Sequence, residues 1–340
     1  MTEGTVDRRV TLRDVAAASG VSVATVSRAL NDDPQISVAT RERVSATAET
    51  LGYVPDLAAR SLAVRASRTF GLMVPDATDP IHGTLVAGFE TAAQAAGYTV
   101  IVANSLGDPA RERRAIREFA AHRVDGLAVM SCLLDHDAVA AMVRPSPVVF
   151  LNSERMSRGR LADLPLGCLR PDEPEGIRLL VEHLVEQGCR RIAYVGADRG
   201  ASNTIRARAV EVQVTARLGT DPVASLIWLP ERRADLAATL RDAGADGVIG
   251  YDDRVALSLL DGFRTVGLSV PGDVAVAGFD DIPFAEISNP RLTTIAQPAS
   301  EMGELAVGEL VAAMATGSLA PSRVLPVRLV VRESTMRAGR

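Results

Sequence analysis

The stretch TLRDVAAASGVSVATVSRALND, residues 11–32, decides how the first part of this chain folds. Thr11 stands three residues before Asp14, a spacing at which the two residues can cap the start of a helix reciprocally. Gly20 can end that helix, and Ser22 can cap a second one directly after it. Another capping serine further on predicts a third helix. The first two helices, joined by a tight turn that contains glycine, predict a helix-turn-helix unit.

The second of these helices carries small and hydroxylated residues where a core helix would carry bulky apolar ones. In a helix-turn-helix, the first residues of the second helix enter the major groove of DNA. Val23 and Ala24 can contact a thymine methyl group there, and Arg28 can bind guanine O6 and N7. The alternative is a small helical bundle whose hydroxyl groups only cap helices and contact water.

From Thr69 onward, short apolar strands alternate with helical segments. This alternation predicts parallel sheets with helices on both faces. About eight strands, divided by an irregular region at residues 152–172, predict two doubly wound subdomains with a cleft between them. The expected strands are TFGLMV, YTVIVA, VDGLAVM, PVVFL, RRIAYVG, ASLIWL, DGVIGY and DVAVAGF.

Residues 11–68 resemble the DNA-binding segment of the LacI/GalR family of bacterial transcription regulators, through the opening stretch and the motif VSATAETLGYVPDLAARSL. The resemblance implies that Val23, Ala24 and Arg28 discriminate between bases. It also implies contacts to the DNA backbone from Thr11, Ser22, Thr25 and Ser27. In this family the segment GYVPDLAARSL becomes a helix on DNA, and its leucine, here Leu62, is inserted into the minor groove. A flexible linker with that leucine packed on the core is the alternative.

The rest of the chain resembles the effector domain of the same family, which shares its fold with periplasmic sugar-binding proteins. The landmarks are TFGLMVPDATDP, EHLVEQGCRRIAYVG, VAVAGFDD and NPRLTTIAQP. The expected fold is therefore α/β, with an all-α helix-turn-helix domain before two parallel-sheet subdomains. The expected bounds are 1–56 for the DNA-binding domain, 57–68 for the hinge, 69–165 with 297–323 for the N-subdomain, and 166–296 with 324–340 for the C-subdomain.

Five polar residues near expected strand ends are candidate effector contacts: Asp79, Asn152, Arg208, Asp252 and Asp280. Carboxylates, an amide and an arginine that converge in a cleft can form charge-assisted hydrogen bonds with the hydroxyl groups of a sugar or polyol. The alternative for Asp252, Asp253 and Asp281 is that they cap helices or bridge the subdomains.

The sequence departs from the family pattern around the expected effector pocket, where Ile81 and His82 also replace the aromatic pair common after the first strand. The family pattern Arg-x-Arg-x-x-Gly is written here Arg206-Ala-Arg208-Ala-Val-Glu211, with glutamate in place of glycine. The single tryptophan, Trp228, falls within an expected strand and is not clearly placed as a stacking platform for a ligand.

Composition and motifs exclude several other classes of protein. A hydrophobic content of 47%, a charged content of 23% and a net charge of −5 are ordinary for a globular protein, and no apolar run is long enough to span a membrane. The N-terminus lacks the apolar core of a secretory signal, and Cys132, Cys168 and Cys189 lack CxxC spacing, so we expect free buried thiols in a reducing cytoplasm. No cofactor loop, catalytic nucleophile motif or spaced metal-ligand cluster is present in the sequence.

The sequence therefore predicts a homodimeric DNA-binding transcription regulator, a repressor, whose partners are operator DNA and a sugar-like effector. We expect it in the cytoplasm, associated with the nucleoid, without cofactor or metal. One rival is a solute-binding protein of a transport system, which leaves the N-terminal helices unexplained. The other is an enzyme on a doubly wound fold, a reading for which no catalytic group is visible.

Overall fold

The computed structural model describes residues 10–31, 33–53, 66–153, 167–196, 201–227 and 233–337. The chain divides into two compact units, Met1–Ser67 and Arg68–Arg340. Among the described residues, no helix is long and apolar enough to cross a membrane.

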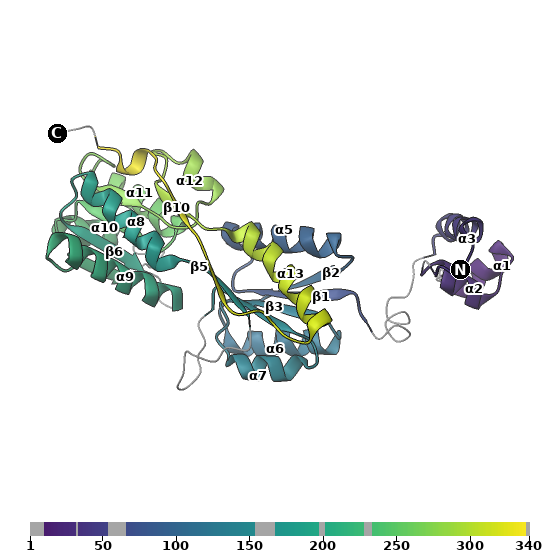
Figure 1. Ribbon diagram of the computed structural model, residues 1–340. Coiled ribbons are helices and arrows are strands. Elements are labelled where there is room, and N and C mark those ends of the chain that lie inside the picture. The colour runs from purple at the N-terminus through teal and green to yellow at the C-terminus, as the bar shows by residue number, and fades with distance from the viewer. Residues whose placement is uncertain are drawn as a thin grey trace, which may run out of the picture. The chain divides into compact units, whose positions relative to one another are not determined.

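The first unit is a three-helix bundle (Figure 1). Its helices are α1 (Leu12–Ser19), α2 (Val23–Ala29) and α3 (Val38–Thr50). Each contributes one valine with no exposed surface to a small common core, namely Val15, Val26 and Val44. Such a small core is enough to hold three short helices only because caps and the turn at Gly20, whose φ is 70°, fix their ends. The three predicted helices are confirmed.

The N-subdomain of the second unit is built on a six-stranded parallel sheet with strand order β11-β5-β4-β3-β1-β2. Its strands are β1 (Thr69–Val74), β2 (Thr99–Asn104), β3 (Gly126–Met130), β4 (Val148–Leu151), β5 (Cys168–Pro171) and β11 (Arg323–Leu325). Helices α5 (Pro80–Ala95) and α13 (Ala299–Thr316) cover one face, and α6 (Pro109–Ala121) and α7 (His136–Val143) cover the other (Figure 1).

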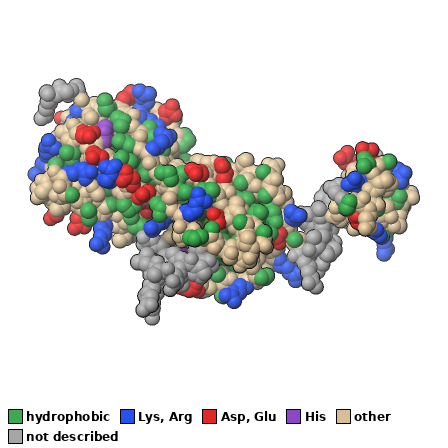
Figure 2. Space-filling model, viewed as in Figure 1, with side chains coloured by type: hydrophobic (Ala, Val, Ile, Leu, Met, Phe, Trp, Pro, Cys, Tyr) green, Lys and Arg blue, Asp and Glu red, His purple; other side chains and the backbone are tan. Residues whose placement is uncertain are grey.

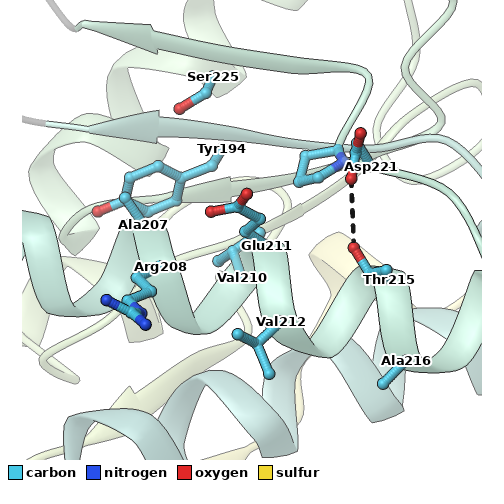
Figure 3. A pocket seen from close by; sticks show the side chains of 11 residues that line it. Tyr194, Ala207, Arg208, Val210, Glu211, Val212, Thr215, Ala216, Asp221 and Ser225 are labelled. Carbon is cyan, nitrogen blue, oxygen red and sulfur yellow. Dashed lines mark hydrogen bonds between the residues drawn. The ribbon is translucent and has the colours of Figure 1, made fainter.

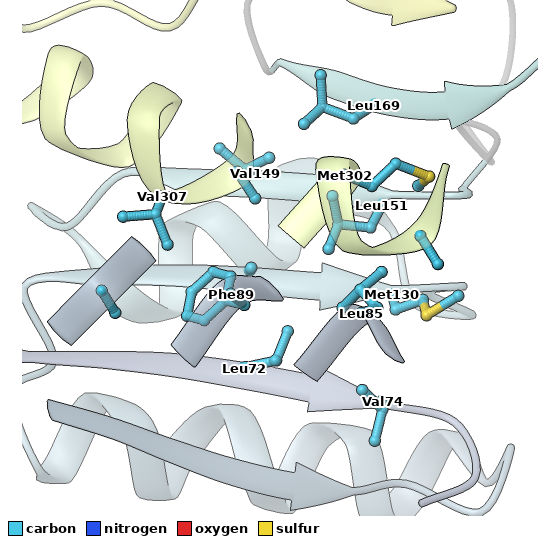
Figure 4. Close-up of a cluster of buried hydrophobic side chains, with 14 of the residues drawn as sticks. Leu72, Val74, Leu85, Phe89, Met130, Val149, Leu151, Leu169, Met302 and Val307 are labelled. Atoms are coloured by element: carbon cyan, nitrogen blue, oxygen red, sulfur yellow. The ribbon is translucent and has the colours of Figure 1, made fainter. Parts of the chain in front are cut away.

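Alternation along the strands divides the core of this subdomain into two layers. Leu72 and Val74 point toward α5 and α13 (Figure 4), whereas Met73 between them packs with α6 and α7. Helices α5 and α13 cross closely at two glycines, because a Cβ atom on Gly88 would lie 2.3 Å from the carbonyl oxygen of Ser300. A Cβ atom on Gly303 would lie 2.4 Å from the α5 backbone.

The C-subdomain has a four-stranded parallel sheet with strand order β7-β6-β8-β9. Its strands are β6 (Ile192–Gly196), β7 (Ala224–Ile227), β8 (Gly247–Gly250) and β9 (Ala275–Ala277). Helices α8 (Glu173–Glu186) and α9 (Ala201–Leu218) pack on one face. Helices α10 (Arg233–Asp242) and α11 (Asp253–Thr265) pack on the other, and α12 (Pro283–Ile287) follows β9.

The chain crosses between the two subdomains more than once. It leaves the first sheet after β5, returns to it through α13, and leaves again after β11 to form the antiparallel pair β10 (Thr294–Ala296) with β12 (Arg328–Val330). A short 3-10 helix, η2 (Glu333–Thr335), ends this segment. Because β5 pairs with β4, the N-subdomain extends to Pro171, beyond the boundary expected near residue 165.

The doubly wound architecture predicted from the sequence is confirmed, and each of the eight expected strands overlaps an observed one. Four strands were not expected: β5, β10, β11 and β12. Each contains only three or four residues, but so do β4, β7, β8 and β9, so length alone does not separate the unexpected strands from the expected ones.

Candidate functional sites

The start of α2 is exposed on the surface of the first unit. Val23 retains 42% of its surface, and Ser22, Ala24 and Arg28 are also exposed, whereas Thr25 and Ser27 are half-buried. Val26 and Ala29 of helix α2 are buried in the core, and the other side chains of the helix are at least partly accessible from outside. The side chains on this face are short, and they can come close to a groove floor without steric conflict.

Two of the residues predicted to contact the DNA backbone also cap helices. The Ser22 hydroxyl accepts a hydrogen bond from the Thr25 backbone N–H at 3.1 Å. The Asp14 carboxylate accepts hydrogen bonds from the Thr11 backbone N–H at 2.8 Å and from its hydroxyl at 2.6 Å. Both residues therefore fix the ends of the two helices while remaining at the surface. Leu62 lies outside the described residues.

Four of the five candidate effector residues lie near the carboxyl ends of strands where the subdomains meet, and we call this region the junction. Asp79 caps α5 by accepting a hydrogen bond from the Ile81 backbone N–H. Asn152 follows β4 with a φ of 44°. Asp252 caps α11, and Asp280 follows β9 with a φ of 128°. The cap on α11 confirms the structural alternative for Asp252, and it leaves the second carboxylate oxygen for other contacts.

Arg254 joins the two subdomains across the junction. Its guanidinium lies 3.2 Å from carboxylate oxygens of Asp76 and of Asp79 in the N-subdomain, and 3.6 Å from Asp252 beside it in the C-subdomain. A second contact crosses the junction at Asn152, whose side-chain oxygen accepts a hydrogen bond from the Ser202 hydroxyl at 3.5 Å. The sequence reading missed Arg254, because on α11 it was one charged residue among several.

On α9, the arginine that faces the junction is Arg206, and it is only 2% exposed. Its Nε donates to Glu173 at 2.7 Å, and one Nη donates to the backbone oxygen of Tyr251. The same Nη lies 3.9 Å from Asp280, and the guanidinium lies 3.8 Å from the ring centre of Phe279. Burial alone lowers the pKa of Arg206, but Glu173, Tyr251 and Asp280 together raise it above its ordinary value, so the group stays charged.

The expectation for Arg208 is wrong. Arg208 is exposed and lines a separate pocket beside β7 with Tyr194, Glu211 and Asp221 (Figure 3). Residues two apart on a helix point in directions about 200° apart, so Arg206 and Arg208 cannot both face the junction. With Arg206 in place, Glu211 no longer stands where the family pattern requires glycine. Ala209, three residues after Arg206, takes that place.

Burial sets the protonation of the junction carboxylates. It raises the pKa of Asp280 well above the ordinary value; Arg206 opposes this rise, and Asp252 and Asp79 add to it. The pKa of Asp252 is also raised, first by burial. These mutual effects place the four groups within one electrostatic cluster.

Two further aspartates have structural roles within the C-subdomain. Asp253 accepts hydrogen bonds from the Ile282 backbone N–H and the Thr294 hydroxyl, and burial raises its pKa to about 7. Asp281 pairs with Arg332 at 2.7 Å, which attaches the C-terminal segment to the C-subdomain.

The described residues hold no group of three or more His, Cys, Asp or Glu side chains placed to bind a metal ion. The three cysteines are buried, and none of them forms a disulfide within the described residues, as predicted. Trp228 falls outside the part of the chain that the structure describes.

Comparisons with known proteins cover both units. Residues 11–56 match the family model of bacterial regulatory proteins of the lacI family, and residues 181–335 match that of the periplasmic binding protein-like domain. The chain is 32% identical to the HTH-type transcriptional regulator GalR of Salmonella typhimurium, over 87% of this chain and 88% of that protein.

Solved structures extend the similarity to the whole chain. A crystal structure of the Lac repressor dimer bound to operator and the anti-inducer ONPF has a TM-score of 0.85 at 28% identity, over 97% of this chain and 100% of that one. The complex of the transcriptional regulator CelR with cellobiose has a TM-score of 0.68 at 28% identity, over 96% of this chain and 100% of that one.

Proposed function

Because this chain belongs to the lacI family of bacterial regulatory proteins, we propose that it is a repressor that binds a palindromic operator as a homodimer. A small polyhydroxylated effector, a sugar or related metabolite, controls its affinity for DNA. Family membership makes the chain a DNA-binding regulator of transcription, not an enzyme. The repressor role, the dimer and the effector are the proposal.

The observation that carries the proposal is the exposed start of α2. Val23 and Ala24 offer apolar contacts to thymine methyl groups, and Arg28 offers two parallel donors to guanine. Thr11, Ser22, Thr25 and Ser27 bind the DNA backbone. The caps at both helix starts hold this surface in a fixed orientation before DNA arrives, so little ordering cost remains on binding.

A homodimer matches the symmetry of a palindromic site, since each protomer presents one helix-turn-helix to one half-site. The structure of the Lac repressor dimer on its operator supports that arrangement, because it is similar to 97% of this chain. In the dimer, Leu62 is inserted into the minor groove and bends the duplex, as the resemblance implies.

The effector binds at the junction and contacts Asp79, Asn152, Asp252 and Asp280. Arg206 contacts it in place of Arg208, the arginine that the sequence predicts. Polar groups from both subdomains meet there, so a ligand that contacts both biases their closure. The CelR complex with cellobiose supports a sugar-like ligand. Because a shared conformational equilibrium links the two sites, effector and operator must alter each other's affinity by the same factor.

The function is tested by selecting DNA from a random pool on the full-length protein and measuring affinity by fluorescence anisotropy. We expect an enriched palindrome, and we expect Arg28→Ala to weaken binding to it by a factor between about five and about 150, since one bidentate contact discriminates by about 1–3 kcal/mol. Binding to random competitor should change far less. Arg43→Ala is the matched control, because Arg43 is an exposed arginine on α3.

A selection that enriches no sequence contradicts the proposed function. Equal affinity of the Arg28→Ala variant and the unmodified protein would contradict the assignment of α2 as the helix that contacts bases.

A further inference from the structure

The arginines at the junction are already neutralised by the protein. Arg206 is held by Glu173, and both side chains are at most 4% exposed. Arg254 lies within 3.6 Å of Asp76, Asp79 and Asp252. Among the described residues of the junction, two arginines therefore face five carboxyl groups, those of Glu173, Asp280, Asp76, Asp79 and Asp252. Asp280 and Asp252 hold a proton more readily than an ordinary aspartate does, but neither supplies a positive charge.

The excess of carboxyl groups over arginines is a local feature of the junction. Over the visible face of the second unit, acidic and basic side chains are interspersed, without one sign dominating (Figure 2). The Arg206–Glu173 pair is further shielded from water, since Phe279 and Tyr251 lie within 3.8 Å and 4.7 Å of the guanidinium. In such surroundings, charges interact more strongly than they do in water.

A phosphate or carboxylate on a ligand needs a cation that is free to pair with it, because burying an uncompensated charge is costly. At this junction a ligand anion would have to displace a protein carboxylate from its arginine. A hydroxyl group can donate to a carboxylate and accept from an arginine without breaking either pair. An ammonium group can donate three hydrogen bonds to the excess carboxylates.

We propose that Glu173 sets the charge class of the effector: it neutralises Arg206, so that the junction accepts an uncharged or amine-bearing polyhydroxylated ligand and rejects its phosphorylated or carboxylated counterpart. This inference rests on the proposed function, because it concerns the same effector site. Glu173 is a specificity-determining residue, since it acts on the ligand through the charge of Arg206.

The first test ranks matched sugars on the unmodified full-length protein by thermal shift and calorimetry. The probes are glucose, glucosamine, glucose 6-phosphate and glucuronate, and the corresponding galactose and ribose series. We expect the tightest ligand to be neutral or aminated, and its anionic counterpart to bind at least about tenfold more weakly, a difference of about 1.4 kcal/mol. A phosphorylated or carboxylated sugar as the tightest ligand overturns the proposal.

The second test uses Glu173→Gln, which keeps the side-chain shape and removes its charge. We expect the ratio of anionic to neutral ligand affinity to rise by at least about tenfold, because the charge of Arg206 becomes available. Glu175→Gln is the matched control, since Glu175 lies on the same helix and pairs with the half-buried Arg178. An unchanged ratio in a folded Glu173→Gln variant overturns the role of Glu173.

Operator binding, measured on the same samples, separates this inference from the proposed function. If the selected palindrome is bound but no probe sugar stabilises the protein, the charge-class inference fails and the DNA-binding function remains. If the variant does not fold, the ranking on the unmodified protein still decides between the two ligand classes.

Discussion

At the scale of single residues, the direction in which a side chain points decides its role. Arg206 and Arg208 are separated by one alanine, yet one is buried against Glu173 and the other is exposed beside Glu211. A motif identifies the residue types but not the phase of the helix that carries them. The orientation of these two side chains therefore replaces Arg208 with Arg206 in the candidate effector site.

Asp253 gives a pH dependence that can be measured. Its pKa is about 7 in the folded chain, raised first by burial, whereas the unfolded value is 3.8. The folded state therefore binds more protons than the unfolded state across this interval, and the free energy of unfolding contributed by Asp253 falls as pH rises from about 4 to about 7.

We expect Asp253→Asn to remove this contribution, so the slope of unfolding free energy against pH becomes more positive between these values. Chemical denaturation at several pH values measures it. Asp261→Asn, an aspartate on the same helix paired with an exposed arginine, is the control. Identical slopes for unmodified protein and Asp253→Asn would argue against a raised pKa in the fold.

At the scale of elements, caps define the helices that serve the function. Ser22 caps α2 at the point where the helix presents its exposed face, and Ser37 caps α3 in the same way through the Thr40 backbone N–H. Helix α2 has only seven residues, too short to be stable alone. Its cap and its two core side chains together keep it folded.

The cap on α2 predicts local opening on its removal. Ser22→Ala loses a capping bond worth about 1 kcal/mol, so the backbone amides of α2 should exchange hydrogen about fivefold faster. Exchange on the full-length protein, read by mass spectrometry or NMR, measures this. Ser27→Ala, in the same helix but not at its cap, is the matched control. Equal exchange rates in the two variants would show that the cap does not limit opening.

At the scale of the whole second unit, polar contacts at the junction join the subdomains, beside apolar contacts such as that of Ile282 with the core of the N-subdomain. Arg254 reaches Asp76 and Asp79 across the junction, and it remains 41% exposed. Because the arginine is still partly in water, each of these ion pairs contributes on the order of 1 kcal/mol, although Asp79 itself is buried. Contacts of this strength allow an effector to shift the equilibrium between open and closed subdomains.

Arg254→Gln should therefore open the junction. We expect the closed population to fall by a factor of about five, the equivalent of about 1 kcal/mol, and the effect to shrink at high salt. Fluorescence energy transfer between labels on the two subdomains reports it. Arg264→Gln serves as control, because Arg264 pairs with Asp261 within the same helix. An unchanged distance distribution in Arg254→Gln would refute the bridging role.

Much of this protein follows from its sequence alone. The caps, the glycine stop at Gly20 and the strand–helix alternation are local patterns, because the residues that interact are close along the chain. They were sufficient to predict the helix-turn-helix, eight of the strands and the two-subdomain architecture. They also placed Asp79, Asn152, Asp252 and Asp280 near strand ends.

Tertiary structure decided the rest, since it brings distant residues together. Glu173 and Arg206 are 33 positions apart, and Arg254 and Asp76 are 178 positions apart, so no local pattern couples them. The short strands β5, β10, β11 and β12 exist only through partners supplied by other segments. Tertiary packing also determines which face of α9 points inward. That orientation places Arg206, and not Arg208, beside the carboxylates of the junction.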